Sequence, residues 1–174
     1  MNAAADAVIT VSAQRWLPAY VGIGSNLADP ARQVERAVAA LAELFGTKLV
    51  VVSPRYRTRP FGEVVQPAFV NAVAGLLTQR TPEALLADLR ALERELGREA
   101  PRERWGPRVI DLDLLVVGRE SRSSAELTLP HPGIAERDFV LYPFADIAPD
   151  VDVPGLGAVR ALRERVINRG LERL

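Results

Sequence analysis

Two helix patterns set between strand-like runs restrict this chain to a small number of folds. They span residues 29–46 and 81–97, and each begins with an N-cap residue followed by proline and ends at a glycine. Apolar residues recur in both at the spacing of a helix that buries one face. They are Val34, Val38, Leu41 and Phe45 in the first helix, and Leu85, Leu89, Leu92 and Leu96 in the second. Strand-like runs occupy residues 19–24, 47–53, 69–78 and 109–117.

The resulting order is strand, helix, strand, strand, helix, strand, which is the ferredoxin-like pattern. It predicts an α+β fold, a ferredoxin-like α/β sandwich in which helices cover one face of an antiparallel sheet. Residues 119–174 add a hairpin-like stretch, a proline-bounded helical patch near 134–146 and an amphipathic helix from about 158. We expect one domain over residues 19–174, preceded by a flexible N-terminal extension of residues 1–18.

The last strand-like run, VIDLDLLVV, places two aspartates in an otherwise apolar segment. Asp111 and Asp113 are two positions apart, so on a strand they share one face, roughly 6 to 7 Å from each other. An unpaired carboxylate in an apolar setting costs at least several kcal/mol. The pair therefore requires a cation, unless the strand is a solvated edge or nearby arginines form salt bridges to it. We expect both side chains to be partly accessible.

The sequence favours a hard cation at this pair. It has no cysteine and a single histidine, His131. Mg²⁺ prefers a few carboxylate oxygens together with phosphate oxygens and water, and two carboxylates on one face can hold two ions that bridge a polyphosphate. We therefore predict magnesium at Asp111 and Asp113. Removal of either aspartate should abolish turnover and leave the fold intact or slightly stabilised.

A loop rich in arginine directly precedes the aspartates. It contains Arg98, Arg102, Arg104 and Arg108. Such a run is often only a solvated loop, but beside two metal-binding carboxylates its arginines could neutralise phosphate oxygens. Pro101, Gly106 and Pro107 also suggest a mobile lid over the substrate.

Three other features have weaker implications. GIGSN at 22–26 lacks the third glycine of a dinucleotide-binding motif and predicts a tight turn. Phe69 and Asn71 share a strand face, where they could stack on and hydrogen-bond to a flat heterocycle, although a core role is the default for the aromatic ring. His131, between two prolines, is expected to be a structural hydrogen-bonding residue.

Composition excludes several classes of partner. The 22 basic and 22 acidic residues give no net charge, so nucleic acid and anionic membrane surfaces are not expected partners. No stretch approaches about 18 consecutive apolar residues, the length of a membrane span, and the first 18 residues do not resemble a signal peptide. We expect a cytoplasmic monomer that acts on small molecules.

Several blocks together resemble the 6-hydroxymethyl-7,8-dihydropterin pyrophosphokinases of folate biosynthesis. The resemblance runs from about residue 20 to 149, and RWGPRVIDLDLL is its most specific part. The blocks are GSNL (24–27), YRTRPFG (56–62), QPAFVNAV (66–73), RWGPRVIDLDLL (104–115), LTLPHP (127–132) and RDFVLYPFADIAP (137–149). These enzymes are ferredoxin-like and transfer pyrophosphate from ATP to the pterin hydroxymethyl group, releasing AMP.

The resemblance implies roles for particular residues. Asp111 and Asp113 would bind two Mg²⁺ ions that arrive with ATP, and Arg98 and Arg108 would act with them in catalysis. The ATP site would consist of Glu93, Arg98, Trp105, Arg108, Leu114, Thr128, His131 and Arg137. The 6-hydroxymethyl-7,8-dihydropterin site would consist of Thr58, Arg59, Phe61, Phe69, Asn71 and Phe139.

The chain departs from the family pattern at three positions. A second loop arginine is replaced by Ala100, an arginine before the L-T-x-P-H block by Glu126, and an aromatic beside the histidine by Pro132. Either Arg102 or Arg104 could take over from the missing loop arginine. Two other functions stay open: another Mg²⁺-dependent nucleotidyl- or phosphotransferase, or a non-catalytic ligand-binding module on a ferredoxin-like scaffold.

Overall fold

The main sheet of the protein is antiparallel throughout and matches the predicted strand order. The computed structural model describes residues 15–60, 65–98 and 106–174. The strands of this sheet are β1 (Leu17–Ser25), β2 (Thr47–Val52), β3 (Tyr56–Thr58), β4 (Phe69–Thr78), β5 (Asp111–Val117) and β10 (Glu172–Arg173). β4 pairs with β1 on one side and with β2 and β3 on the other, while β5 pairs with β1 and lies at an edge. The order β5-β1-β4-β2 is that of a ferredoxin-like sheet, so the prediction is confirmed.

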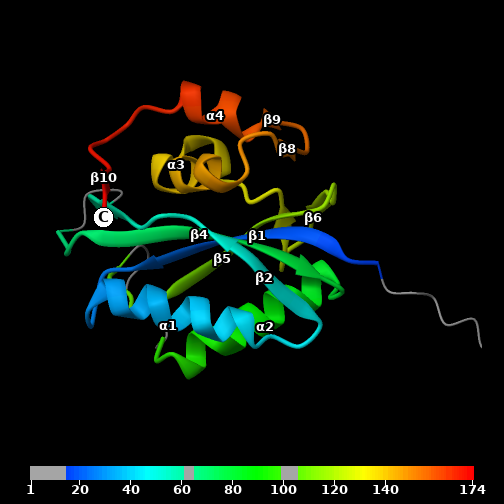
Figure 1. Cartoon of the computed structure of the whole chain (residues 1–174), viewed down its shortest axis with the longest axis horizontal. Coiled ribbons are helices and arrows are strands. Elements are labelled where there is room, and N and C mark those ends of the chain that lie inside the picture. Colours follow the sequence, from blue (N-terminus) through cyan, green and yellow to red (C-terminus); the bar gives the residue numbers. More distant parts are fainter. Residues whose placement is uncertain (1–14, 61–64, 99–105) are drawn as a thin grey trace, which may run out of the picture.

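Helices cover both faces of the sheet, which corrects the expectation of one covered face. α1 (Pro30–Ala42) and α2 (Pro82–Glu95) lie on one face, and α3 (Asp138–Ile147) and α4 (Val159–Arg165) lie on the other (Figure 1). Two apolar clusters fill the two interfaces. The first includes Val34, Leu41, Leu85 and Leu89, and the second includes Val73, Leu115, Phe144 and Leu162. Alternate residues of β5 supply both clusters, which is why the strand is apolar along most of its length.

Both long helices begin at the predicted capping residues. The side chain of Asp29 accepts a hydrogen bond from the backbone N–H of Arg32, and Thr81 does the same for Ala84. Phe45 is an exception, because α1 ends at Ala42 and the phenylalanine side chain is left 86% exposed. The prediction that Phe45 belongs to the buried helix face was wrong.

Other boundaries also differ from those predicted. β1 begins at Leu17, so it includes two residues assigned to the N-terminal extension, and residues 1–14 of that extension lie outside the described residues. β3 lies between the strands predicted at 47–53 and 69–78, where no strand was predicted, and β5 begins at Asp111, two residues later than predicted. The C-terminal helix is short, and the chain after it returns to the main sheet as β10.

The remaining elements are small. The predicted hairpin is formed by β6 (Arg122–Ser123) and β7 (Thr128–Leu129), and β8 (Asp152–Val153) pairs with β9 (Gly157–Ala158). A 3-10 turn, η1 (Ile134–Glu136), precedes α3 within the predicted helical patch. Over the described ranges of the chain, every helix is too short or too polar to cross a membrane.

Candidate active site

The two aspartates lie at the N-terminal end of β5, on the sheet face that α3 partly covers. Their side chains are 22% and 34% exposed for Asp111 and Asp113, so the expected partial accessibility is confirmed. Asp111 lies opposite Gly24 of β1, and Gly24 lies opposite Asn71 of β4. Directly opposed residues point to the same face, so a carboxylate and an amide flank Gly24, and the Asn71 Oδ1 lies only 2.8 Å from the position of a Cβ at this glycine.

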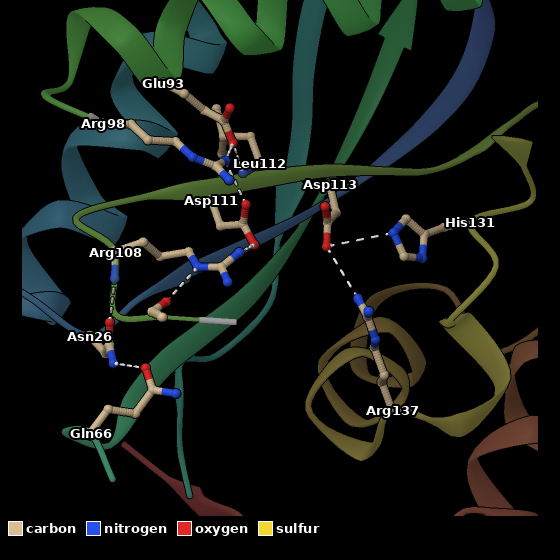
Figure 2. Close-up of polar contacts among 11 residues, drawn as sticks. Asn26, Gln66, Glu93, Arg98, Arg108, Asp111, Leu112, Asp113, His131 and Arg137 are labelled. Atoms are coloured by element: carbon tan, nitrogen blue, oxygen red, sulfur yellow. Dashed lines mark hydrogen bonds and ion pairs between the residues drawn. The ribbon is translucent and has the colours of Figure 1, made fainter. Parts of the chain in front are cut away.

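Two arginines neutralise Asp111. Arg98 Nη1 lies 2.6 Å from one carboxylate oxygen, and Arg108 Nη1 lies 2.7 Å from the other (Figure 2). These are the distances of strong charge-assisted hydrogen bonds. Arg98 and Arg108 come from the two ends of the loop between α2 and β5, so the carboxylate holds those ends together.

Glu93 supports this arrangement from α2 and is itself buried. One of its oxygens, Oε1, accepts a hydrogen bond of 2.7 Å from the backbone N–H of Leu112 and forms an ion pair with Arg98. Among the described strands, β5 pairs with β1 alone, and Glu93 satisfies an N–H on the other edge of β5. Burial raises the pKa of Glu93, while its hydrogen bond to Leu112 acts in the opposite direction. Glu93 therefore positions Arg98 and the edge of β5.

Asp113 is less well compensated than Asp111. Its Oδ2 lies 3.4 Å from Arg137 Nη1 and 3.8 Å from His131 Nε2, both longer than a strong charge-assisted hydrogen bond (Figure 2). Burial and the negative charge of Asp111 raise the pKa of Asp113 to about 6. The sequence left two alternatives to a metal site, a solvated edge strand and salt bridges to nearby arginines. The structure shows both features, because β5 is an edge strand and two arginines form salt bridges to Asp111. The incomplete pairing of Asp113 is what favours a further cation here.

His131 is held as a neutral side chain. Its Nδ1 accepts a hydrogen bond of 3.1 Å from the backbone N–H of Gly133, so the proton lies on Nε2, which faces Asp113. Burial and the nearby Arg137 lower the pKa of His131 to about 4. His131 thus forms the structural hydrogen bond expected from the sequence and also lies next to the carboxylate pair.

A first cavity opens beside the aspartates and contains the described residues predicted for the pterin site. It is lined by Gly24, Thr58, Arg59, Gln66, Phe69, Asn71, Arg108, Asp111, Asp113, Arg137 and Phe139. Asn71 is buried, and its Nδ2 donates a hydrogen bond of 2.7 Å to the hydroxyl of Thr58. Phe69 begins β4 and Phe139 lies in the first turn of α3, so the aromatic rings come from separate elements.

A second cavity lies on the other side of Asp113. It contains Leu114, Thr128 and His131, which were predicted for the ATP site. The other lining residues are Leu86, Arg90, Leu112, Asp113, Ser124, Ala125, Glu126, Leu127 and Pro132. Asp113 is shared by the two cavities. This carboxylate is therefore placed where a group could pass between a ligand in one cavity and a ligand in the other.

Asn26 and Gln66 are site residues that were not singled out from the sequence. Asn26 exchanges hydrogen bonds with the backbone of Arg108, and its Nδ2 donates to Gln66 Oε1 at 3.0 Å and to the carbonyl of Pro67 at 3.1 Å. This junction joins three segments that are far apart in the sequence. The available signal was their presence in the GSNL and QPAFVNAV blocks.

Some predicted site residues cannot be placed. Phe61 and Trp105 lie outside the described residues, as do Arg102 and Arg104. The predicted lid is likewise outside them, except for its ends at Arg98 and 106–108. These roles stay predictions.

The described side chains do not form a complete metal site by themselves. Among residues 15–60, 65–98 and 106–174, no group of three or more histidine, cysteine, aspartate or glutamate side chains is placed to hold a metal ion. Two partly exposed carboxylates remain, which is the ligand set expected when phosphate oxygens and water complete the coordination of Mg²⁺. The donor set therefore fits a cation that binds together with a nucleotide.

Comparisons with known proteins cover most of the chain. Residues 20–149 match the model of the 7,8-dihydro-6-hydroxymethylpterin-pyrophosphokinase family. The 2-amino-4-hydroxy-6-hydroxymethyldihydropteridine pyrophosphokinase of Pseudomonas aeruginosa is 44% identical over 89% of this chain and 95% of its own length. That of Methylorubrum extorquens is 42% identical over 90% and 98%.

A solved structure supports the fold independently. The Plasmodium falciparum HPPK-DHPS with pteroate superposes with a TM-score of 0.68 at 14% identity, over 87% of this chain and 42% of that one. This chain therefore spans less than half of the Plasmodium protein, and the likeness concerns the fold alone. The family match and the bacterial relatives cover most of the chain, so it belongs to the 7,8-dihydro-6-hydroxymethylpterin-pyrophosphokinase family.

Proposed function

We propose that this protein transfers the pyrophosphoryl group of ATP to the hydroxymethyl group of 6-hydroxymethyl-7,8-dihydropterin in folate biosynthesis. The products are the pterin diphosphate and AMP. The observation that carries the proposal is the position of Asp113, which lines both a cavity with aromatic and amide groups and a cavity beside His131. A transfer between two bound substrates needs such a shared wall.

The first cavity suits the pterin. Phe139 and Phe69 offer ring faces from separate elements, and Asn71 and Thr58 offer buried hydrogen-bonding groups. Aromatic stacking and a few well-placed polar groups are the usual means of binding a flat heterocycle. Because Asn71 and Asp111 flank Gly24, the reacting hydroxymethyl group would lie toward the carboxylates.

The second cavity suits the nucleotide. Leu114 and Leu86 provide apolar walls for a base, and Thr128 and His131 provide polar groups near the carboxylates. The phosphate chain would then extend past Asp113 toward the first cavity. Arg137, 3.4 Å from Asp113, would meet the phosphates at this point.

Asp111 and Asp113 would hold two Mg²⁺ ions, which supply positive charge to the phosphate oxygens when bound. Arg98 and Arg108 now pair with Asp111, so arrival of the metal-nucleotide complex would release them toward phosphate. Both arginines belong to the ends of the loop expected to act as a lid. This exchange of partners would couple nucleotide binding to loop closure.

The transfer relies on positioning and charge neutralisation. The pterin hydroxyl would attack the β-phosphorus as the bond from that phosphorus to the AMP oxygen breaks, and its proton would pass to water, while the arginines meet the charge that develops. His131 is not a suitable general base, because its Nδ1 is occupied by Gly133 and its Nε2 carries the proton. It would instead donate a hydrogen bond toward Asp113 or a phosphate oxygen.

The monomeric state expected from the sequence stays a prediction. The cytoplasmic location inferred from the sequence stays a prediction.

The test is the identity of the nucleotide product. The protein is incubated with ATP, Mg²⁺ and the reduced hydroxymethylpterin, and the nucleotides are separated by chromatography. AMP formed in equal amount to the pterin diphosphate supports the proposal. ADP or free pyrophosphate would point to a different phosphotransferase or nucleotidyltransferase, and binding without consumption of ATP would point to a ligand-binding module.

A further inference from the structure

The C-terminal segment, residues 166–174, lies beyond the family match but borders the proposed pterin cavity. The match ends at residue 149, whereas the chain continues through α4 and returns to the main sheet as β10 (Figure 1). Residues at the end of a chain normally fray unless they are tied down. Here the segment is attached at two places, and each attachment is next to one wall of the first cavity.

The first attachment is to β3. Glu172 pairs with Arg57 and Arg173 pairs with Tyr56, and the backbone N–H of Leu174 donates to the carbonyl of Arg55 at 2.9 Å. The residues that directly follow Arg57 are Thr58 and Arg59, which line the first cavity. The C-terminal segment therefore fixes the edge strand that supplies one wall.

The second attachment is to the start of α3. The backbone N–H of Arg169 donates a hydrogen bond of 2.8 Å to Oδ2 of Asp138, a residue only 4% exposed. The other oxygen of Asp138 accepts a hydrogen bond of 2.9 Å from the backbone N–H of Phe139. Phe139 lines the first cavity from the opposite wall. One buried carboxylate thus links the C-terminal segment to the aromatic residue of the cavity.

The space between these attachments confirms that the segment is close to the site. A hollow is lined by Thr58, Arg59, Pro60, Asp138, Phe139, Arg169 and Leu171. Thr58, Arg59 and Phe139 also line the first cavity. Arg169 and Leu171 therefore lie directly behind residues proposed to touch the pterin.

We propose that residues 166–174 set the distance between the two walls of the pterin cavity and so determine its affinity for the pterin. Asp138 and the backbone of Arg169 are positioning residues that act through Phe139, while β10 acts through Thr58. The proposal rests on the proposed function, because it takes the first cavity as the pterin site. It assigns a role in substrate binding to a segment outside the family match.

A pair of variants at one position isolates the hydrogen bond to Asp138. Arg169→Pro removes both the N–H and the side chain, whereas Arg169→Ala removes the side chain and keeps the N–H. Comparison of the two therefore measures the loss of the backbone hydrogen bond. Glu172→Gln is the control for surface charge, because it leaves the backbone pairing of β10 intact.

The measurements are the dissociation constant of the pterin in the presence of a non-hydrolysable ATP analogue and Mg²⁺, and that of the analogue alone. We expect pterin binding about tenfold weaker in Arg169→Pro than in Arg169→Ala, as for the loss of one hydrogen bond to a charged acceptor. Analogue binding should be equal in both, because none of the described residues that line the second cavity belongs to the segment. Glu172→Gln should bind both ligands like the parent.

Asp138→Asn provides an independent test, because an amide has one accepting oxygen and cannot accept both hydrogen bonds. It should weaken pterin binding while leaving analogue binding unchanged. Equal pterin affinity in Arg169→Pro and Arg169→Ala would overturn the inference, and so would an equal loss of pterin and analogue binding, which is the result of general destabilisation. The product of the parent protein tests the proposed function separately.

Discussion

Replacement of Asp113 by asparagine is expected to stabilise the ligand-free protein and to abolish its activity. Burial and the charge of Asp111 raise the pKa of Asp113 from 3.8 to about 6. This rise in pKa corresponds to a cost of roughly 3 kcal/mol for the ionised form of Asp113 in the folded protein. The side chain is 34% exposed, so water screens much of this cost, and we expect a gain of about 1 kcal/mol in the free energy of unfolding at pH 7.

The sign of the pH dependence follows from the same shift. Between pH 4 and 6 the folded protein binds a proton at Asp113 more readily than the unfolded chain does, so stability falls as the pH rises through this window. The neutral asparagine has no such dependence. The stability difference between Asp113→Asn and the parent should therefore be greatest above about pH 6 and should fade as the pH decreases toward 4.

Asp111→Asn is the matched control, and its effect on stability should have the opposite sign. Asp111 accepts hydrogen bonds from Arg98 and Arg108 at 2.6 and 2.7 Å. Loss of the negative charge weakens both contacts, so we expect a destabilisation of about 1 to 2 kcal/mol. The sequence alone suggested that removal of either aspartate would be neutral or stabilising, and the paired geometry of Asp111 revises this for one of the two.

The assay is urea denaturation of the parent and both variants from pH 4 to 8, followed by circular dichroism, together with measurement of AMP formation. Loss of activity in both variants, with higher stability of Asp113→Asn and lower stability of Asp111→Asn at pH 7, supports the roles assigned to the two carboxylates. Lower stability of Asp113→Asn than of the parent at pH 7 would show that ionised Asp113 does not destabilise the folded protein. A stability difference between the two that grows as the pH falls would show the same.

Three further outcomes are expected. Gly24→Ala places a Cβ 2.8 Å from Asn71 Oδ1, so it should displace this amide and raise the KM for the pterin by about tenfold in steady-state assays. Because the pKa of His131 is lowered to about 4, the imidazole resonances of this single histidine should show no titration near pH 6.5 in nuclear magnetic resonance spectra, and a midpoint there would contradict the neutral His131. Tyr56→Phe removes the 2.6 Å hydrogen bond to Asp146, which with burial raises the pKa of Tyr56 to about 12, and should cost about 1 kcal/mol of stability in thermal unfolding.

The core of the fold could be predicted because its signals are local. Capping residues, prolines and glycines marked α1 and α2, and alternating or continuous apolar runs marked β1, β2, β4 and β5. Phe45 had the correct spacing for the buried face but lies beyond the last turn. Spacing alone does not show where a helix stops.

Two short strands and the second helical layer were harder to predict because their structure depends on contacts between distant parts of the chain. β3 and β10 are short strands that exist by pairing with each other and with β4, and neither has a periodic pattern of its own. The covering of the second sheet face by α3 also depends on long-range packing. The β-strand propensity of individual residues carries little information about such long-range pairings.

The residues of the candidate site were predicted through the family resemblance, whereas the contacts among the described ones came from the structure. The sequence identified Asp111 and Asp113 as a pair, whereas the structure shows one well compensated and the other shared between two cavities. Asn26 was missed, because its role depends on three segments that meet only in the folded chain.

Asp111 and Asp113 are proposed to hold the divalent cations that accompany ATP. The most direct measurement is Mn²⁺ binding by electron paramagnetic resonance, with and without a non-hydrolysable ATP analogue, in the parent, Asp111→Asn and Asp113→Asn. We predict tight Mn²⁺ binding by the parent only when the analogue is present, and much weaker binding in both variants. Undiminished binding of Mn²⁺ with the analogue in Asp113→Asn, or equally tight binding without the analogue, would contradict the account.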